Sequence, residues 1–184
     1  MFKHLAIAAF MVSLAPIAAS AQPLERTDGR IFKDVAAQVT SYARFTVFDD
    51  IRGSVEQGVL TLSGKVTMPF KRDDIARRAA QVPGVTRVVN KIDVLPVSIF
   101  DDQLRYQIAR AIYDSPSFWH YASMVNPPIH IVVERGRVTL TGVVNSEVER
   151  MLARSLASGF AAFSVTSELR TDKEARVELE FVGK

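Results

Sequence analysis

Aromatic side chains and one arginine gather in a short stretch of the chain, where they could bind a lipid surface or a protein partner. On a helical wheel, one side of the segment after Leu104 is apolar, and the other side holds Tyr106, Arg110 and Tyr113. More aromatic residues follow at Phe118, Trp119 and Tyr121. Rings with a polar tip beside a cation suit a membrane headgroup layer or a protein surface. We therefore predict non-covalent binding through these six side chains.

Residues suited to catalysis or metal binding are scarce. The chain has no cysteine, and His120 and His130 have no matching ligands at a metal-binding spacing. The adjacent pairs Asp49–Asp50 and Asp101–Asp102 suit turns or a helix's first turn better than a catalytic dyad. No Ser-His-Asp order, P-loop or dinucleotide fingerprint is present. We expect a protein that is not an enzyme and uses no metal or small-molecule cofactor.

The charge of the chain gives a second constraint on its partners. The formal net charge of +3 is modest and lacks the concentrated basic stripe typical of nucleic-acid binding. One basic cluster comprises Lys71, Arg72, Arg77 and Arg78. Because Asp73 and Asp74 precede two of these arginines by four positions, we interpret the cluster as a solvated helix face rather than a binding patch. We expect no nucleic-acid partner.

The segments that position these residues form an internal repeat. Residues 55–64 read VEQGVLTLSG and residues 133–142 read VERGRVTLTG, with six identical positions. Such a repeat indicates one small module that is used twice. In each copy a central Gly follows Gln57 or Arg135, which suits the positive φ of a tight hairpin turn.

The same order of elements is predicted in both copies. Apolar residues at helical spacing begin each copy, a hairpin follows, and a second helix precedes a third strand. The fold class is therefore α+β, with two tandem αββαβ modules, each a small mixed sheet covered on one face by two helices. The linker Leu95–Ser98 is short and contains Pro96, so we expect the modules to touch.

The first 21 residues have the pattern of a signal peptide. Leu5–Leu14 is an apolar run too short to span a bilayer, and Ala19-Ser20-Ala21 supplies the small residues of a cleavage site. We expect cleavage before Gln22; an uncleaved anchor is the alternative. Because a lipid-modified anchor requires a cysteine, we expect an exported, periplasmic protein that is not a lipoprotein.

The repeated motifs resemble those of the BON (bacterial OsmY and nodulation) domain family. The similarity lies in the hairpins over residues 58–64 (GVLTLSG) and 136–142 (GRVTLTG), and in Val82-Pro83-Gly84-Val85. The second copy departs from the family pattern at Phe160-Ala161-Ala162-Phe163 and within residues 118–128. Two copies behind a signal peptide are similar to the dual-BON periplasmic proteins. The expected domains are signal peptide 1–21, lead 22–29, BON domains 30–96 and 97–171, and tail 172–184, a possible extra strand.

The resemblance implies binding rather than catalysis. It implies association with envelope proteins or phospholipid, and roles in envelope stress or as a chaperone. We expect peripheral binding to anionic membrane phospholipid that supports envelope integrity. The alternative is a chaperone or adaptor that binds exported clients under envelope or osmotic stress. A packing role for the rings of residues 106–121, between the modules or over their own helix, also stays open.

Overall fold

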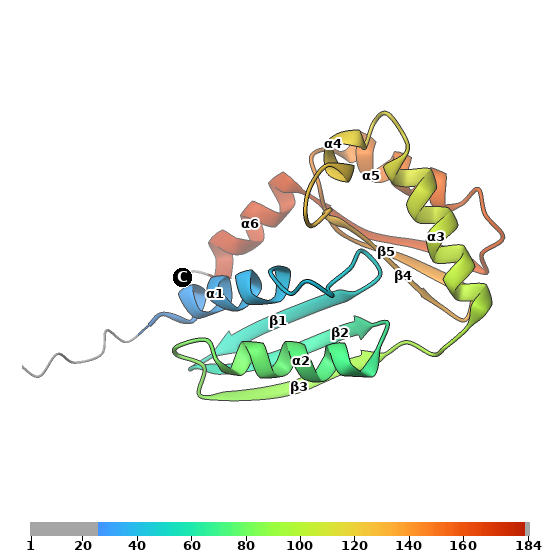
Figure 1. The fold of residues 1–184 in the computed structure, drawn as a ribbon. Coiled ribbons are helices and arrows are strands. Elements are labelled where there is room, and N and C mark those ends of the chain that lie inside the picture. Colours follow the sequence, from blue (N-terminus) through green and yellow to red (C-terminus); the bar gives the residue numbers. More distant parts are fainter. Residues whose placement is uncertain (1–25, 183–184) are drawn as a thin grey trace, which may run out of the picture.

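The computed structural model describes residues 26–182 as two α+β modules joined by a short linker (Figure 1). Each module contains a three-stranded mixed sheet with helices on one face. This architecture confirms the predicted fold class of two tandem αββαβ modules. The predicted signal peptide and residues 22–25 of the predicted lead lie outside the described residues.

The first module follows the predicted order of elements. It consists of α1 (Asp28–Thr40), β1 (Asp50–Glu56), β2 (Val59–Val66), α2 (Pro69–Ala80) and β3 (Arg87–Val94). β1 pairs with β2 antiparallel, and β2 pairs with β3 parallel. The apolar faces of the two helices and of the sheet meet in one core, which includes Ile31, Leu62 and Ile75.

The second module repeats this order with one addition. It consists of α3 (Ile99–Tyr113), α4 (Trp119–Ala122), β4 (Ile129–Glu134), β5 (Arg137–Val144), α5 (Glu147–Ala157) and β6 (Ser164–Thr171). The short helix α4 lies in the segment that has no counterpart in the first copy. The hairpin register is the same in both modules, because Ile51 pairs with Gly64 and Ile129 pairs with Gly142.

An aspartate at the start of a helix holds each hairpin turn. The two central residues of both turns have positive φ, between 50° and 75°, as a two-residue hairpin requires. Asp28 accepts hydrogen bonds from both amides of turn 57–58, and Asp101 does the same for turn 135–136, over 2.8 to 3.0 Å. These bonds fix the turn between β4 and β5 beside the first turn of α3.

The tail forms a helix, so the expected extra strand was wrong. Helix α6 spans Asp172–Val182. Thr171 and Glu174 form a capping box, in which the Thr171 amide donates to the Glu174 carboxylate over 2.7 Å and the Glu174 amide donates back to the hydroxyl. Arg176 then pairs with Asp172 one turn away. These local bonds favour helix over the charge alternation that suggested a strand.

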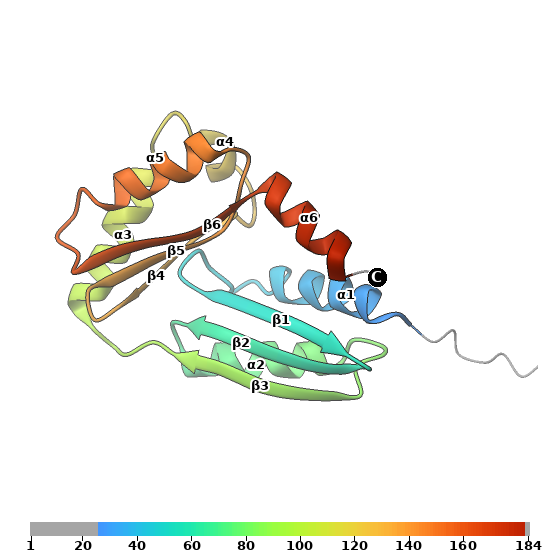
Figure 2. The ribbon, with the colours of Figure 1, turned by 180° about the vertical axis from the view of Figure 1, so that it is seen from behind.

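The two modules touch along β1, β4 and the loop between α1 and β1, as expected (Figure 2). The amide of Ile131 in β4 donates to the carbonyl of Val47 over 2.7 Å, and Phe45 contacts the ring of His130. Ion pairs join Arg52 to Glu168 and Lys65 to Glu134. The first module therefore rests against the helix-free face and outer edge of the second sheet.

Candidate functional site

The outer face of α3 carries two of the predicted binding residues. Tyr106 is 60% exposed and Arg110 is exposed, whereas Ile108 on the inner side is fully buried. Arg110 forms no ion pair within residues 26–182 that would neutralise its charge. The helical wheel therefore placed these two side chains correctly.

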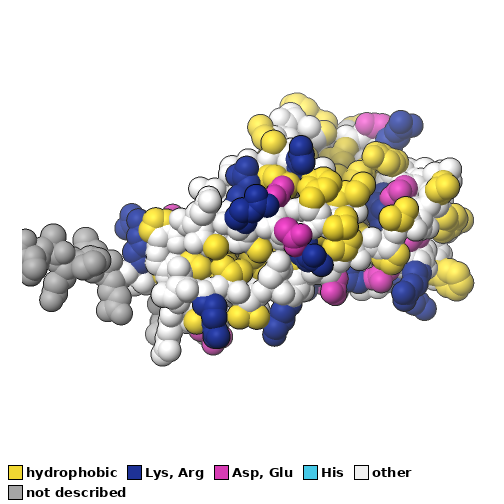
Figure 3. Space-filling view, turned by 60° about the horizontal axis from the view of Figure 1, so that its bottom comes forward, with side chains coloured by type: hydrophobic (Ala, Val, Ile, Leu, Met, Phe, Trp, Pro, Cys, Tyr) yellow, Lys and Arg dark blue, Asp and Glu magenta, His cyan; other side chains and the backbone are white. Residues whose placement is uncertain are grey.

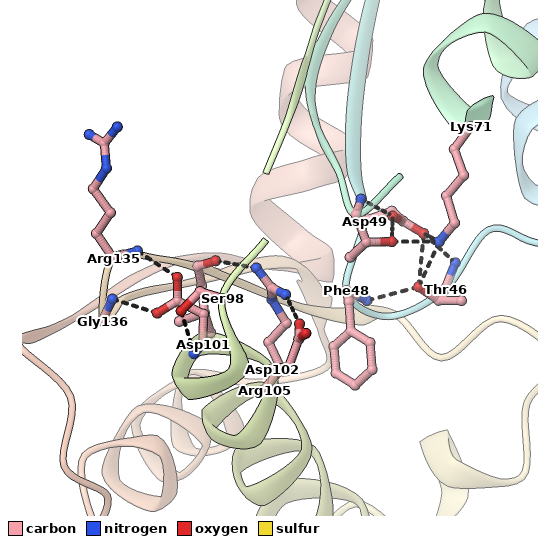
Figure 4. A network of polar contacts seen from close by, with 12 residues as sticks. Thr46, Phe48, Asp49, Lys71, Ser98, Asp101, Asp102, Arg105, Arg135 and Gly136 are labelled. Carbon is pink, nitrogen blue, oxygen red and sulfur yellow. Dashed lines mark hydrogen bonds and ion pairs between the residues drawn. The ribbon is translucent and has the colours of Figure 1, made fainter. Parts of the chain in front are cut away.

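Tyr106 also has a packing role. Its ring meets the ring of Phe48 edge to face, with 5.1 Å between centroids. Phe48 projects from the loop before β1 toward α3 (Figure 4) and packs against the second core. Tyr106 thus closes part of the junction between the modules, as the packing alternative proposed, and still presents more than half of its surface to solvent.

Tyr113 is directed toward the sheet rather than toward solvent. It is partly buried, and its hydroxyl donates a hydrogen bond to the carbonyl of Ile129 in the edge strand β4. Burial raises the pKa of Tyr113 well above its ordinary value, so the donating hydroxyl is retained. Tyr113 therefore covers part of the outer edge of β4.

Phe118 and Tyr121 are buried in the second core, so their assignment to an exposed binding surface was wrong. The Tyr121 hydroxyl donates to Glu149 over 2.7 Å and accepts from the amide of Asn145. Burial and the hydrogen bond to Glu149 raise the pKa of Tyr121 to about 12. Residues 118–128, the segment without a counterpart in the first copy, therefore fold back over their own module at these two rings. Both rings belong to the core of the second module, together with residues of α3, α5 and the second sheet.

Trp119 faces solvent from the start of α4. It is 69% exposed, since its neighbours Phe118 and Tyr121 occupy the inner side of the same helical turn. Met124 and Val125, just after α4, are also exposed. The predicted surface is therefore reduced to Tyr106, Arg110 and Trp119, with these two apolar neighbours.

Three members of the basic cluster of the first module form ion pairs within that module, and the fourth, Arg78, lies over the ring of Tyr42. Lys71 is buried and donates to Asp49 over 2.6 Å (Figure 4). Arg77 pairs with Asp74 at a spacing of three rather than the four expected, and Arg72 pairs with Asp73. The interpretation as a solvated helix face was therefore wrong for the buried Lys71, whereas Arg72 and Arg77 lie on the exposed face of α2 and pair with acids of the same helix.

The sequence analysis did not single out a further group of exposed apolar side chains near the start of α3. These are Val97, Ile99, Phe100 and Phe163. Hydrophobic side chains lie among basic and acidic side chains over the half of the surface farther from the N-terminal trace (Figure 3). A position-by-position comparison of the two copies would have found this group, because the first copy has threonines at two of the equivalent positions.

The described residues hold no cluster of side chains suited to a metal ion. No group of three or more His, Cys, Asp or Glu side chains that could hold a metal occurs within residues 26–182. A hollow of about 640 Å³ on the first sheet is lined mainly by polar residues, including Asp28, Ser54 and Arg87. Over the same residues, no helix is both long and apolar enough to cross a membrane.

Comparison with known proteins identifies the modules. The family model of the BON domain matches residues 27–96 and 101–172. No curated protein matches the chain. A structure of CdsD, a structural protein of the type III secretion system of Chlamydia trachomatis, is 12% identical and has a TM-score of 0.30, with 80% of this chain and 97% of that chain covered. A CdsD C-terminal domain from the same organism is 16% identical, with a TM-score of 0.32 and coverages of 77% and 65%. These TM-scores are too low to support an argument.

Proposed function

The chain belongs to the BON domain family, and on that basis we propose that it is a non-catalytic envelope protein whose second module binds anionic phospholipid at a membrane surface. BON domains occur in periplasmic or membrane-associated proteins, which fits a peripheral role. The observation that carries the proposal is the exposure of Tyr106, Arg110 and Trp119 on the second module, with no ion pair to Arg110 among residues 26–182. Aromatic rings of this kind prefer the headgroup layer, and a guanidinium binds phosphate oxygens.

The first module supports this assignment by contrast. Because Asp28 and Asp101 hold equivalent turns, Tyr106 corresponds to Lys33 and Arg110 corresponds to Ala37. The outer face of α1 therefore lacks both the ring and the neighbouring cation. If the fold alone required them, both copies would carry them.

The alternative, capture of exported polypeptides, is less well supported at the strand edge of the second module. Val47, Tyr113 and Arg105 bond to backbone groups of Ile131, Ile129 and Val133 in β4. A client strand could pair with β4 only by displacing these partners. The outer edge of β4 is therefore occupied within the chain itself.

Co-sedimentation with vesicles tests the proposal. We expect the protein to bind vesicles of anionic phospholipid, to bind zwitterionic vesicles weakly, and to dissociate as salt is raised, because exposed charges are screened beyond about 8 Å at physiological ionic strength. The triple variant Tyr106→Ser, Arg110→Gln, Trp119→Ser should lose binding by roughly tenfold or more. The matched control, Lys33→Gln on α1, should bind within about twofold of the wild type.

Two results would oppose the proposal. Unchanged vesicle binding by a folded triple variant would show that Tyr106, Arg110 and Trp119 do not form the lipid-binding surface. Salt-independent binding to unfolded polypeptides, without vesicle binding, would favour the chaperone alternative, because client capture depends on apolar contact rather than on headgroup charge.

A further inference from the structure

Two phenylalanine rings flank the hairpin turn of the second module. A Cβ added to Gly136 would lie 3.5 Å from Phe100 Cε1 and 3.4 Å from Phe163 Cδ2. Phe163 is 85% exposed and Phe100 is 51% exposed. Ile99 and Val97, at the start of α3 and in the linker, are more than three-quarters exposed. We call these four residues, Val97, Ile99, Phe100 and Phe163, the turn rim.

Two arginines beside the turn rim have no acidic partner in the described part of the chain. Arg135 and Arg137 are exposed and occur in none of the ion pairs of residues 26–182. Figure 4 shows that the side chain of Arg135 extends away from Asp101. The turn rim is therefore bordered by positive charge that no ion pair within residues 26–182 neutralises.

The acids at this turn, at the start of α3 and at the end of β4, are already engaged. Asp101 accepts from the two turn amides, Asp102 pairs with Arg105, and Glu134 pairs with Lys65. Each carboxylate thus serves the fold or the module junction. An anion that bound Arg135 and Arg137 would have to come from a partner.

The first module has the same turn without these side chains. The amides of Thr86 and Phe163 donate to equivalent turn carbonyls, of Gly58 and Gly136, so these two residues correspond. By the same reasoning Phe100 corresponds to Thr27, and Arg135 and Arg137 correspond to Gln57 and Val59. The backbone geometry of this hairpin turn does not require exposed rings or arginines, since the first copy forms the same turn with other residues.

We propose that the turn rim is a membrane-insertion point, at which its apolar side chains enter a bilayer while Arg135 and Arg137 bind the phosphates of anionic phospholipid. This inference rests on the proposed function and adds a second contact to the surface at Tyr106, Arg110 and Trp119. Charge complementarity identifies the occupant, because two unpaired arginines beside exposed apolar side chains match an anionic headgroup layer over acyl chains.

The geometry of α3 joins the two contacts. The helix has 15 residues, so it is about 22 Å long at about 1.5 Å per residue. The turn rim lies at its N-terminal end, and α4 with Trp119 follows its C-terminal end (Figures 1 and 2). A helix that lay along the membrane surface would bring both ends to the bilayer.

Substitutions at and beside the turn rim, three of them to the residue of the first copy, provide the test. The variant Phe100→Thr with Phe163→Thr should reduce co-sedimentation with anionic vesicles by roughly tenfold, since it removes two rings from the buried contact. The variant Arg135→Gln with Arg137→Gln should bind more weakly and with a smaller salt dependence. The matched control, Met68→Thr with Phe70→Thr, removes exposed apolar side chains from the first module and should bind within about twofold of the wild type.

A fluorescence reporter keeps the test decisive if a rim variant is unstable. In the variant Trp119→Phe with Phe163→Trp, the single tryptophan lies in the turn rim. We expect its emission to shift to shorter wavelength on addition of anionic vesicles. Emission that stays unshifted on vesicles that carry the protein would overturn the inference.

The outcomes separate the inference from the proposed function. If the wild type binds anionic vesicles and the rim variants bind equally well, the turn rim is not an insertion point, and the proposed function still stands. Absence of wild-type binding to anionic vesicles would overturn both. Self-association of the wild type that the phenylalanine variant abolishes would show that the turn rim binds a second copy, and would overturn the lipid assignment.

Discussion

At the residue scale, equivalent positions in the two modules hold side chains of opposite charge, the buried Lys71 and the partly buried Glu149. Lys71 in α2 donates to Asp49, which also accepts from Thr67. At the equivalent position in α5, Glu149 accepts from Tyr121. The partners are 22 and 28 residues apart, so local sequence could not reveal either pair. Lys71 was therefore read as a solvated helix residue, and Tyr121 as a binding residue.

The carboxylate of Asp101 is expected to stabilise the turn that carries Arg135. It accepts two backbone amides and is buried, so Asp101→Ala leaves both amides without their acceptor. We expect the free energy of unfolding to fall by about 1 to 3 kcal/mol in urea titrations. The exposed Asp93 provides the control, because Asp93→Ala should change stability by less than about 0.5 kcal/mol. Equal effects of the two substitutions would contradict this role.

At the element scale, the hydrophobic periodicity was sufficient to predict the helices and strands of both modules except the short helix α4. Amphipathic helices and Gly-centred hairpins are local patterns, and the repeat supplied each prediction twice. The tail was mispredicted, because the alternation over residues 176–180 is too short a pattern to distinguish a strand from a helix. The capping box of Thr171 and Glu174 was the local signal for helix.

The hairpins depend on one glycine per module, at Gly64 and Gly142. Gly142 has φ of +113°, and an added Cβ would lie 1.8 Å from the carbonyl oxygen of Pro128. We expect Gly142→Ala to lower the free energy of unfolding by more than about 2 kcal/mol or to prevent folding.

The opposite change in stability is expected for an alanine at Gly29 in α1, where no atom lies within 4 Å of an added Cβ. Gly29→Ala should raise the free energy of unfolding by roughly 0.4 to 1 kcal/mol, because alanine restricts the unfolded chain. Thermal and urea unfolding of the two variants measure the contrast. A tolerated Gly142→Ala would mean that the close approach of the two strands is not required.

At the scale of the whole molecule, the junction between the modules contains a partly buried histidine. His130 lies in β4 against Phe45 of the first module. Burial lowers the pKa of His130 below its ordinary value, although the nearby charges of Asp50 and Asp49 act in the opposite direction. A neutral imidazole is therefore favoured where the modules meet.

The lowered pKa makes stability depend on pH. The unfolded chain binds a proton at His130 near pH 6.5, before the folded protein does, so stability should fall as the pH decreases through about 6.5. We expect His130→Gln to lose less stability than the wild type between about pH 7.5 and about pH 5.5 in urea titrations. His120→Gln, outside the junction, should keep the wild-type loss. An unchanged loss in His130→Gln would contradict the assignment.

The candidate surface could be predicted only in part. The helical wheel identified the exposed Tyr106 and Arg110, because exposure on α3 follows from periodicity. It could not separate the exposed Trp119 from the buried Phe118, because the fold of residues 118–128 depends on contacts with α5 and the sheet. The turn rim joins Phe100 to Phe163, which are distant in sequence, so only the three-dimensional structure brings them together.

The most direct test of membrane binding uses the single tryptophan of the chain. Trp119 is exposed in the free protein, so its emission should be that of a water-exposed indole. Titration with anionic phospholipid vesicles should shift this emission to shorter wavelength, and added salt should reverse the shift. Zwitterionic vesicles should produce little change. An emission spectrum that stays constant in the presence of saturating anionic vesicles would contradict the proposal that this surface enters the membrane.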